Sequence, residues 1–148
     1  MSISTVDETR RTEEAARGLV DAFQSGDIER LLTYYPDGDF TYVDMWEPDT
    51  VLRTHGELAT WMEEFGSVFD MSTGDLELVS MTVQGTRAVV EIKLKGKYVG
   101  EGAPSGGLEM EILSCVVYAH IDDDGLVHEE RVYAEPVESQ IARALGGK

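Results

Sequence analysis

The chain has 148 residues, with 12 Lys or Arg against 29 Asp or Glu, so its formal net charge is −17. This length suits one domain, and we predict a single domain over residues 1–148. So acidic a surface repels phosphate groups and anionic lipid headgroups, which argues against nucleic acid and membranes as partners.

Several kinds of site and compartment are disfavoured by the sequence. A single cysteine, Cys115, excludes an internal disulfide, and the three histidines show no metal-ligand spacing. We therefore predict neither a metal nor a cofactor. Residues 1–14 lack the apolar core of a signal peptide, and no apolar run reaches the ~20 residues of a membrane span. We expect a cytoplasmic protein.

The first half of the chain predicts three helices and a short hairpin. A helix capped by Thr5 or Asp7 runs to about residue 25, because apolar residues recur at helical spacing. The other predicted elements of this half are a helix at 28–35, a strand at 40–44, its hairpin partner at 50–54 and a helix at 56–69.

The second half is rich in strands. Turn residues separate four predicted strands, at 75–84, 86–98, 108–121 and 126–135, and a last helix follows at 137–145. Three helices followed by an antiparallel meander predict an α+β fold with the helices on one face of the sheet.

Alternation along the strands predicts which face is buried. The even positions of 86–98 are apolar and the odd ones are mostly charged, so the even side faces the core. Strand 108–121 turns apolar on its odd side as well, at Leu113, Cys115 and Val117. A strand apolar on both faces is covered on both. We predict a homodimer packed through this outer face; the alternative is that the C-terminal segment covers it. Alternation in 126–135 favours neither orientation.

Short motifs in order along the chain resemble one family. Residues 27–44 (DIERLLTYYPDGDFTYVD) resemble the opening of ketosteroid isomerase-like and SnoaL-like proteins, a short helix followed by a strand that ends in Asp. Residues 55–58, 106–107, 124–127 and 133–135 resemble the later elements of that family. Residues 140–146 resemble the tail of SnoaL-like polyketide cyclases. The chain is thus similar, over nearly its whole length, to the nuclear transport factor 2-like superfamily.

This resemblance implies a fold and a site. The fold is a cone-shaped, curved and mainly antiparallel sheet wrapped around three N-terminal helices, with a deep apolar pocket inside. Asp44 matches the general base of the isomerase branch and is implied to point into the cone. The family hairpin makes the even side of strand 126–135 interior, which brings Glu130, and with it His128, to the pocket. SnoaL-like cyclases carry an interior acid/base residue near the position of Glu130.

The sequence also departs from two branches of the family. The two oxyanion-hole donors of the isomerase branch match Leu19 and Ser114, so both strong donors are missing. The epoxide hydrolase branch resembles this chain at Arg131, Tyr133 and Glu135, but the last Asp of its Asp-Arg-Asp constellation falls on Val132. These departures favour cyclase chemistry.

Two carboxyl groups are the candidate catalytic residues. A carboxylate in an apolar cone loses hydration, so its pKa rises, and two in one cone push their pKa values apart. One then takes a proton while the other gives one. We predict Asp44 as base and Glu130 as acid. The alternatives are a strand-end Asp44 bonded to nearby backbone, and a solvated Glu130.

Nine further residues are candidates for binding the substrate. Tyr42 can donate a hydrogen bond, Trp46 can wall the mouth, and His55 and His128 face either the pocket or the surface. The others are expected as polar contacts or pocket wall: Met62, Phe65, Met110, Ser114 and Tyr118.

These observations favour an acid/base enzyme acting on a hydrophobic, oxygenated small molecule. A polyketide cyclase or an epoxide-opening cyclase fits best. The alternatives are a non-catalytic binding or dimerisation module on the same fold, and a ketosteroid isomerase-like isomerase or dehydratase. The feature that discriminates between them is whether Asp44 and Glu130 face one closed apolar cavity.

Overall fold

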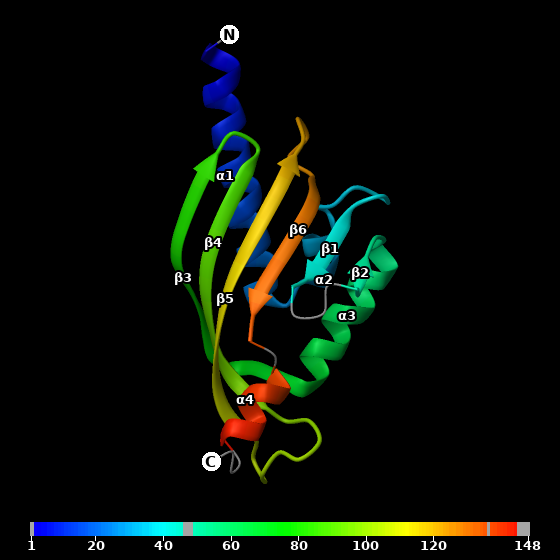
Figure 1. Ribbon diagram of the computed structural model, residues 1–148, viewed down its shortest axis with the longest axis vertical. Helices are drawn as coiled ribbons and strands as arrows, with labels where there is room; N and C mark the ends of the chain where they lie inside the picture. Colours follow the sequence, from blue (N-terminus) through cyan, green and yellow to red (C-terminus); the bar gives the residue numbers. More distant parts are fainter. Residues whose placement is uncertain (1, 46–48, 136, 145–148) are drawn as a thin grey trace.

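The computed structural model describes residues 2–45, 49–135 and 137–144, with side chains except at 2–5, 73, 137–138 and 144. Its helices are α1 (Ser2–Ser25), α2 (Ile28–Leu32), α3 (His55–Val68) and α4 (Val137–Ala144). Its strands are β1 (Thr41–Asp44), β2 (Val51–Leu52), β3 (Phe69–Gln84), β4 (Arg87–Tyr98), β5 (Leu108–Ile121) and β6 (Val127–Ala134) (Figure 1). None of the described helices is long and apolar enough to cross a membrane.

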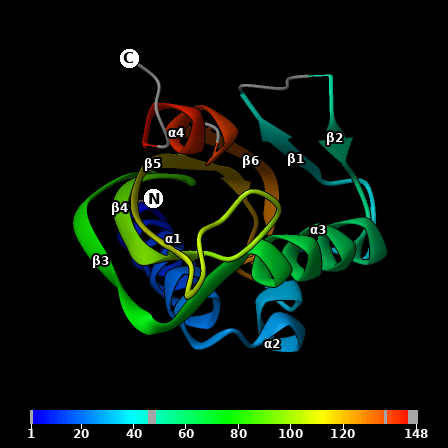
Figure 2. The same cartoon turned by 90° about the horizontal axis from the view of Figure 1, so that it is seen from below.

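The described strands form one six-stranded sheet in the order β2-β1-β6-β5-β4-β3. Every neighbouring pair is antiparallel except β1 and β6, which run parallel. Viewed from below, the sheet curves around α1, and α3 closes the other side of the cone (Figure 2). The predicted α+β fold, a curved and mainly antiparallel sheet around N-terminal helices, is confirmed.

Burial along β4 confirms the predicted inner face, since Ala88, Val90, Ile92 and Leu94 are all buried. The alternation works because a core on one face selects apolar side chains at every second position.

The pairing of β6 with its neighbours β1 and β5 shows which of its side chains face the core. The alternation of apolar residues in β6 did not settle this. Glu130 lies opposite Tyr118 of β5 on one side and opposite Tyr42 of β1 on the other. Asp44 lies opposite Val132. Residues at paired positions share a face, so Tyr42, Asp44, Glu130 and Val132 all point into the cone.

Several element boundaries differ from the predictions. Helix α1 begins at Ser2, before the two predicted caps Thr5 and Asp7, and β2 covers only Val51–Leu52 of the predicted 50–54. Strand β3 begins directly after α3 at Phe69, not at residue 75, and its register shifts between Asp70 and Asp75. The stretch between Asp70 and Asp75 is therefore an irregularity within a longer strand. Helix α2 ends at Leu32 rather than residue 35, because the next three amide groups bond to carbonyls three residues back.

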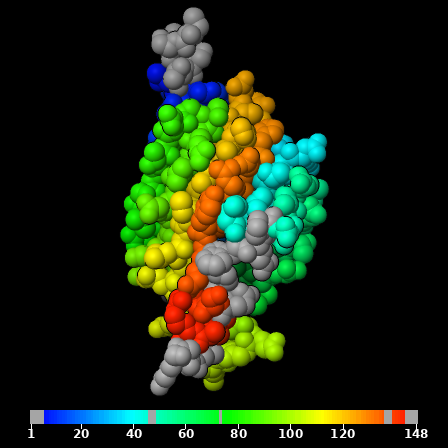
Figure 3. Space-filling view, in the orientation of Figure 1, coloured from blue at the N-terminus to red at the C-terminus, as the bar shows by residue number. Residues whose placement is uncertain are grey.

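The convex outer face of the sheet carries exposed apolar side chains. Leu113 of β5 is 62% exposed and Tyr133 of β6 is 42% exposed. Cys115, two positions from Leu113, pairs directly with Tyr133. Helix α4 follows the end of β6 (Figures 1 and 3), and its Ile141 lines the inner cavity. The described part of the C-terminal segment therefore leaves Leu113 exposed.

Gly96 supports the close approach of β3 to β4. A Cβ at this position would lie 2.6 Å from the Asp70 carbonyl oxygen and 2.8 Å from the Phe69 ring. We expect Gly96→Ala to lower the free energy of unfolding by about 1–3 kcal/mol in urea titrations, because overpacking forces the strands apart. Gly66→Ala in α3, whose Cβ would meet none of the described atoms within 4 Å, is the control. It should raise stability by about 0.5–1 kcal/mol. Equal effects of the two changes would contradict the close approach.

Candidate active site

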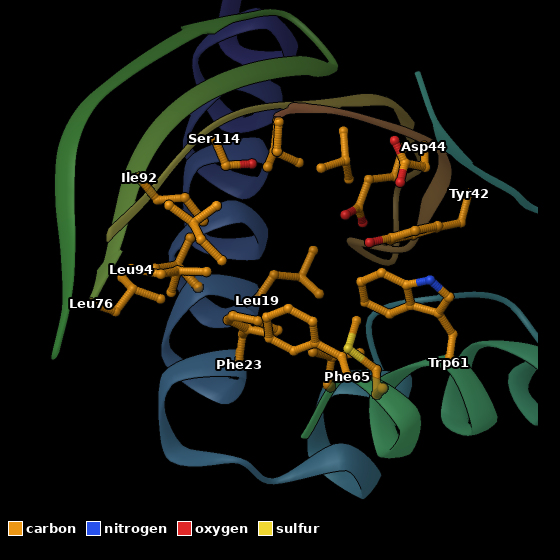
Figure 4. Close-up of a pocket in the computed structure, with 18 of the residues that line it drawn as sticks. Leu19, Phe23, Tyr42, Asp44, Trp61, Phe65, Leu76, Ile92, Leu94 and Ser114 are labelled. Carbon is orange, nitrogen blue, oxygen red and sulfur yellow. The ribbon is translucent and has the colours of Figure 1, made fainter. Parts of the chain in front are cut away.

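A cavity of about 460 Å³ lies inside the cone. Ligand pockets commonly span roughly 300–1,000 Å³, so this one can hold a small organic molecule. Apolar side chains from the sheet and from α1 form one end of it: Leu19, Phe23, Leu76, Ile92 and Leu94 (Figure 4).

The opposite end of the cavity is polar and aromatic. Asp44 and Tyr42 of β1 and Trp61 of α3 lie across the cavity from Leu76, Ile92 and Leu94 (Figure 4). Glu130 of β6 and Tyr118 of β5 line the same cavity. The central strands of the sheet and one face of α3 therefore deliver the polar groups.

Glu130 is the central carboxyl of this end. It is only 5% exposed, and the Tyr35 hydroxyl donates a hydrogen bond to its Oε1. The Val127 amide donates to the Tyr34 carbonyl at 2.7 Å, which holds the segment after α2 against β6. Removal from water raises the pKa of Glu130 to about 8, although the hydrogen bond from Tyr35 acts in the opposite direction. At neutral pH the carboxyl is mostly protonated and can give a proton.

Three buried tyrosines surround Glu130, namely Tyr35, Tyr42 and Tyr118. Burial, followed by the charge that Glu130 carries when ionised, raises the pKa of each well above its ordinary value. All three therefore keep their hydroxyl protons and act as donors beside the carboxyl.

Asp44, the last residue of β1, is half-buried and lines the same cavity. Its charge contributes to raising the pKa of Tyr42, which fits two groups on one face of one strand. The structure thus brings Asp44 and Glu130 to a single cavity.

Five of the nine predicted binding residues line the cavity: Tyr42, Met62, Phe65, Ser114 and Tyr118. Met110 packs against the core but is not among the described lining residues. Trp46 lies outside the described residues.

Neither His55 nor His128 is among the described residues that line the cavity. His55, the first residue of α3, has its Nε2 3.0 Å from the Tyr35 carbonyl oxygen. His128 has its Nε2 2.8 Å from Asp122 Oδ2 in the β5–β6 turn. This aspartate lies in the hairpin turn, so the partner of His128 is local and His128 stays at that end of β6.

Trp61 and Tyr35 are among the lining residues that were not predicted as site residues. Trp61 lies 5.5 Å from the ring of Tyr42 and stacks on Phe65 at 5.6 Å between centroids. Its place on the apolar stripe of the third helix was the signal available in the sequence. Tyr35 has no such signal, because its partner Glu130 is 95 residues away.

Most of the chain matches the model of one protein family. The model for the SnoaL-like domain matches residues 16–130. The chain belongs to the SnoaL-like domain family. This match confirms the resemblance to SnoaL-like proteins that the sequence motifs indicated. No curated protein gives a significant match to the chain.

Solved structures share the fold of this SnoaL-like protein at low sequence identity. A protein of Shewanella putrefaciens assigned as a SnoaL-like polyketide cyclase has a TM-score of 0.76 at 17% identity, covering 91% of this chain and 97% of that one. A Bacillus subtilis protein assigned as an isomerase gives 0.73 at 13%, covering 95% and 96%. An LEH-like epoxide hydrolase of M. tuberculosis gives 0.69 at 17%, covering 93% and 94%. At these identities the likeness shows the fold alone.

The raised pKa of Glu130 predicts the sign of a pH effect on stability. The folded state holds this proton up to about pH 8, whereas the unfolded chain releases it near the ordinary value of 4.5. Relative to Glu130→Gln, the wild type should lose about 1.4 kcal/mol of unfolding free energy per pH unit across that window. Urea titrations at several pH values measure this slope, and its absence would contradict the buried carboxyl.

Tyr35→Phe tests the hydrogen bond within the same experiment. Tyr35 opposes the upward shift in the pKa of Glu130, so its loss should extend the sloping window above pH 8. Tyr98→Phe is the matched control, because its hydroxyl bonds to the Glu101 carbonyl instead.

Proposed function

We propose that this protein is an acid/base enzyme acting on a hydrophobic, oxygenated small molecule, with Glu130 as the acid and Asp44 as the base. The observation that carries the proposal is a buried carboxyl, Glu130, that shares a largely apolar cavity with the carboxyl of Asp44. Groups with separated acid/base roles in one cavity support proton transfer in both directions near neutral pH.

Aldol closure of a polyketide uses both groups in turn. Asp44 takes a proton from the carbon beside a ketone, while Glu130 gives its proton to the ketone oxygen, and an enol forms. The enol carbon then bonds to a second carbonyl carbon of the same molecule. As it does so, the enol hydroxyl returns its proton to Glu130, and the second oxygen takes the proton from Asp44. Both carboxyl groups are restored, and the apolar wall holds the substrate in its reactive conformation.

Opening of an epoxide by an internal hydroxyl needs the same pair. Glu130 gives a proton to the epoxide oxygen as the C–O bond breaks, and Asp44 takes the proton of the attacking hydroxyl as the new C–O bond forms. Proton exchange with solvent then resets the two groups. Likeness to a protein assigned as a polyketide cyclase and to an LEH-like epoxide hydrolase supports this range of reactions.

The donors around Glu130 take over the task of those missing at Leu19 and Ser114. A carboxyl kept neutral by an apolar site can donate to a developing oxyanion, which is an established catalytic device in other enzymes. Tyr42 and Tyr118 lie opposite Glu130 on the two neighbouring strands and add hydroxyl donors at the same end of the cavity.

Mass spectrometry of metabolite mixtures tests the proposed function. A product of unchanged mass indicates isomerisation or ring closure, loss of one water indicates aldol closure with dehydration, and gain of one water indicates hydrolysis. We expect Asp44→Asn and Glu130→Gln each to lower the rate by about 10²–10⁴-fold, because each removes one proton-transfer group. The alkaline fall in rate near pH 8 should disappear in Glu130→Gln.

Glu77→Gln, an exposed carboxyl of β3, is the control and should keep the wild-type rate. Unchanged turnover in both Asp44→Asn and Glu130→Gln would contradict the proposal that these two residues are catalytic. Binding of a metabolite with no conversion would favour the non-catalytic module instead.

We also propose that the protein is a homodimer that packs through the outer sheet face. The exposed Leu113 and Tyr133, together with Cys115 between them, support this face as the interface. We expect sedimentation to give the mass of two chains for the wild type and of one chain for Leu113→Lys, which places a charge at the centre. Val79→Lys, at an exposed apolar residue of β3, is the control and should stay dimeric. A wild-type mass of one chain would contradict the dimer.

A further inference from the structure

A second hollow lies beside the cavity. It is a groove of about 380 Å³, lined by the end of α1, the start of α2, the end of α3 and the first residues of β3. Each of these elements contributes an apolar side chain to it, namely Phe23, Ile28, Phe65 and Met71. The groove therefore offers apolar space that the proposed chemistry does not use.

A dividing layer of residues separates the groove from the cavity. Four of the described residues line both hollows: Phe23 of α1, Leu31 of α2, and Met62 and Phe65 of α3. Met62 and Phe65 are three positions apart, so they lie on one face of their helix. Because the same residues border both hollows, the size of their side chains determines whether the two spaces join.

Ring contacts hold the dividing layer in place. The centroid of Phe65 lies 5.6 Å from that of Trp61, 5.4 Å from that of Phe69 and 6.0 Å from that of Phe23. These separations are those of aromatic rings in contact. Figure 4 shows Phe23 and Phe65 across the cavity from Asp44. A ligand that binds at Asp44 and extends toward these rings therefore ends against a packed surface.

We infer that Phe23, Met62 and Phe65 set the longest ligand that the cavity accepts. Each methylene that leaves water stabilises the complex until the ligand reaches the dividing layer. A further methylene then stays in water or forces packed rings apart, which is unfavourable. Smaller side chains in the dividing layer join the groove to the cavity and lengthen the apolar space. The inference rests on the proposed function only in placing the substrate in this cavity, and it adds a limit on substrate length.

A homologous series of ligands tests the limit in the wild-type protein. The probes are straight-chain methyl ketones, lengthened one methylene at a time up to the longest that stays dissolved, and each is titrated calorimetrically. We expect the affinity to rise about fourfold per methylene and then to stop rising at one chain length. Affinity that rises by this factor through the whole series would overturn the inference.

Two variants make the dividing layer smaller, Met62→Ala and Phe65→Leu. We expect each to lengthen the limit by about two methylenes, with a further gain of about fourfold in affinity for each methylene. Ile28→Ala is the control, because Ile28 lines the groove but is not among the described residues that line the cavity. It should keep the wild-type limit. An unchanged limit in both Met62→Ala and Phe65→Leu would overturn the inference, and if one of them does not fold, the other decides.

A second substitution shows whether the extra length lies in the groove. Gly66 lines the groove but is not among the described lining residues of the cavity, and a Cβ there would meet no described atom within 4 Å. We expect Gly66→Trp, added to Met62→Ala, to restore the wild-type limit, because the indole ring fills the groove.

Gly56→Trp is the matched control for this double variant. Gly56 is also an exposed glycine of α3 with no described atom within 4 Å of its Cβ position, and it is not among the described lining residues of either hollow. Added to Met62→Ala, it should keep the longer limit. A longer limit that survives Gly66→Trp would overturn the inference, because the extra length would then lie outside the groove.

Binding and turnover separate this inference from the proposed function. A protein whose length limit follows Met62 and Phe65, but whose turnover is unchanged in Asp44→Asn and Glu130→Gln, keeps the inference and rejects the catalytic pair. A protein that loses turnover in those two variants, yet has the same length limit whatever residue stands at 62 or 65, keeps the proposed function and rejects the dividing layer as the limit.

Discussion

The site depends on one constraint, which is that Glu130 is held out of water. A carboxyl in an apolar cavity is costly when ionised, and a single hydrogen bond from Tyr35 offsets part of that cost. The sheet order serves the same constraint, because β6 lies between β1 and β5 and thus between Tyr42 and Tyr118. Burial of Glu130, its raised pKa and the donors around it therefore share one physical origin.

The arrangement shows how a shared fold can place polar groups differently. Leu19 and Ser114 occupy the positions where the isomerase resemblance implies strong donors, and both line this cavity. The donors instead come from β1, β5, β6 and the segment after α2. A scaffold of this kind fixes the shape of the cavity, while the chemistry depends on which wall positions carry hydroxyl and carboxyl groups.

Most of the fold could be predicted from the spacing of apolar residues and from the positions of turn residues. They place β4 and its buried face within one residue, because a core on one side of a strand enforces alternation. They fail at β6, where Val127 and Tyr133 are apolar on the side opposite to Val132, and the orientation depends on pairing with β1 and β5. The hydrogen bond from Tyr35 to Glu130 joins residues 95 apart and leaves no local pattern. Asp44 and Glu130 were found through family resemblance rather than through physical signals.

The parallel pairing of β1 with β6 also has a consequence for biosynthesis. The first strand of the sheet finds its main partner only in the last strand, so this contact has a large sequence separation. Chains dominated by such contacts fold slowly, since a long loop must close before the contact stabilises anything. A ribosome that has released only the helices and the first three strands leaves the inner edge of β1 without a partner. The polar end of the cavity is therefore among the last parts of the molecule to assemble. While β6 is still being synthesised, the exposed edge of β1 can pair with another chain, which favours aggregation.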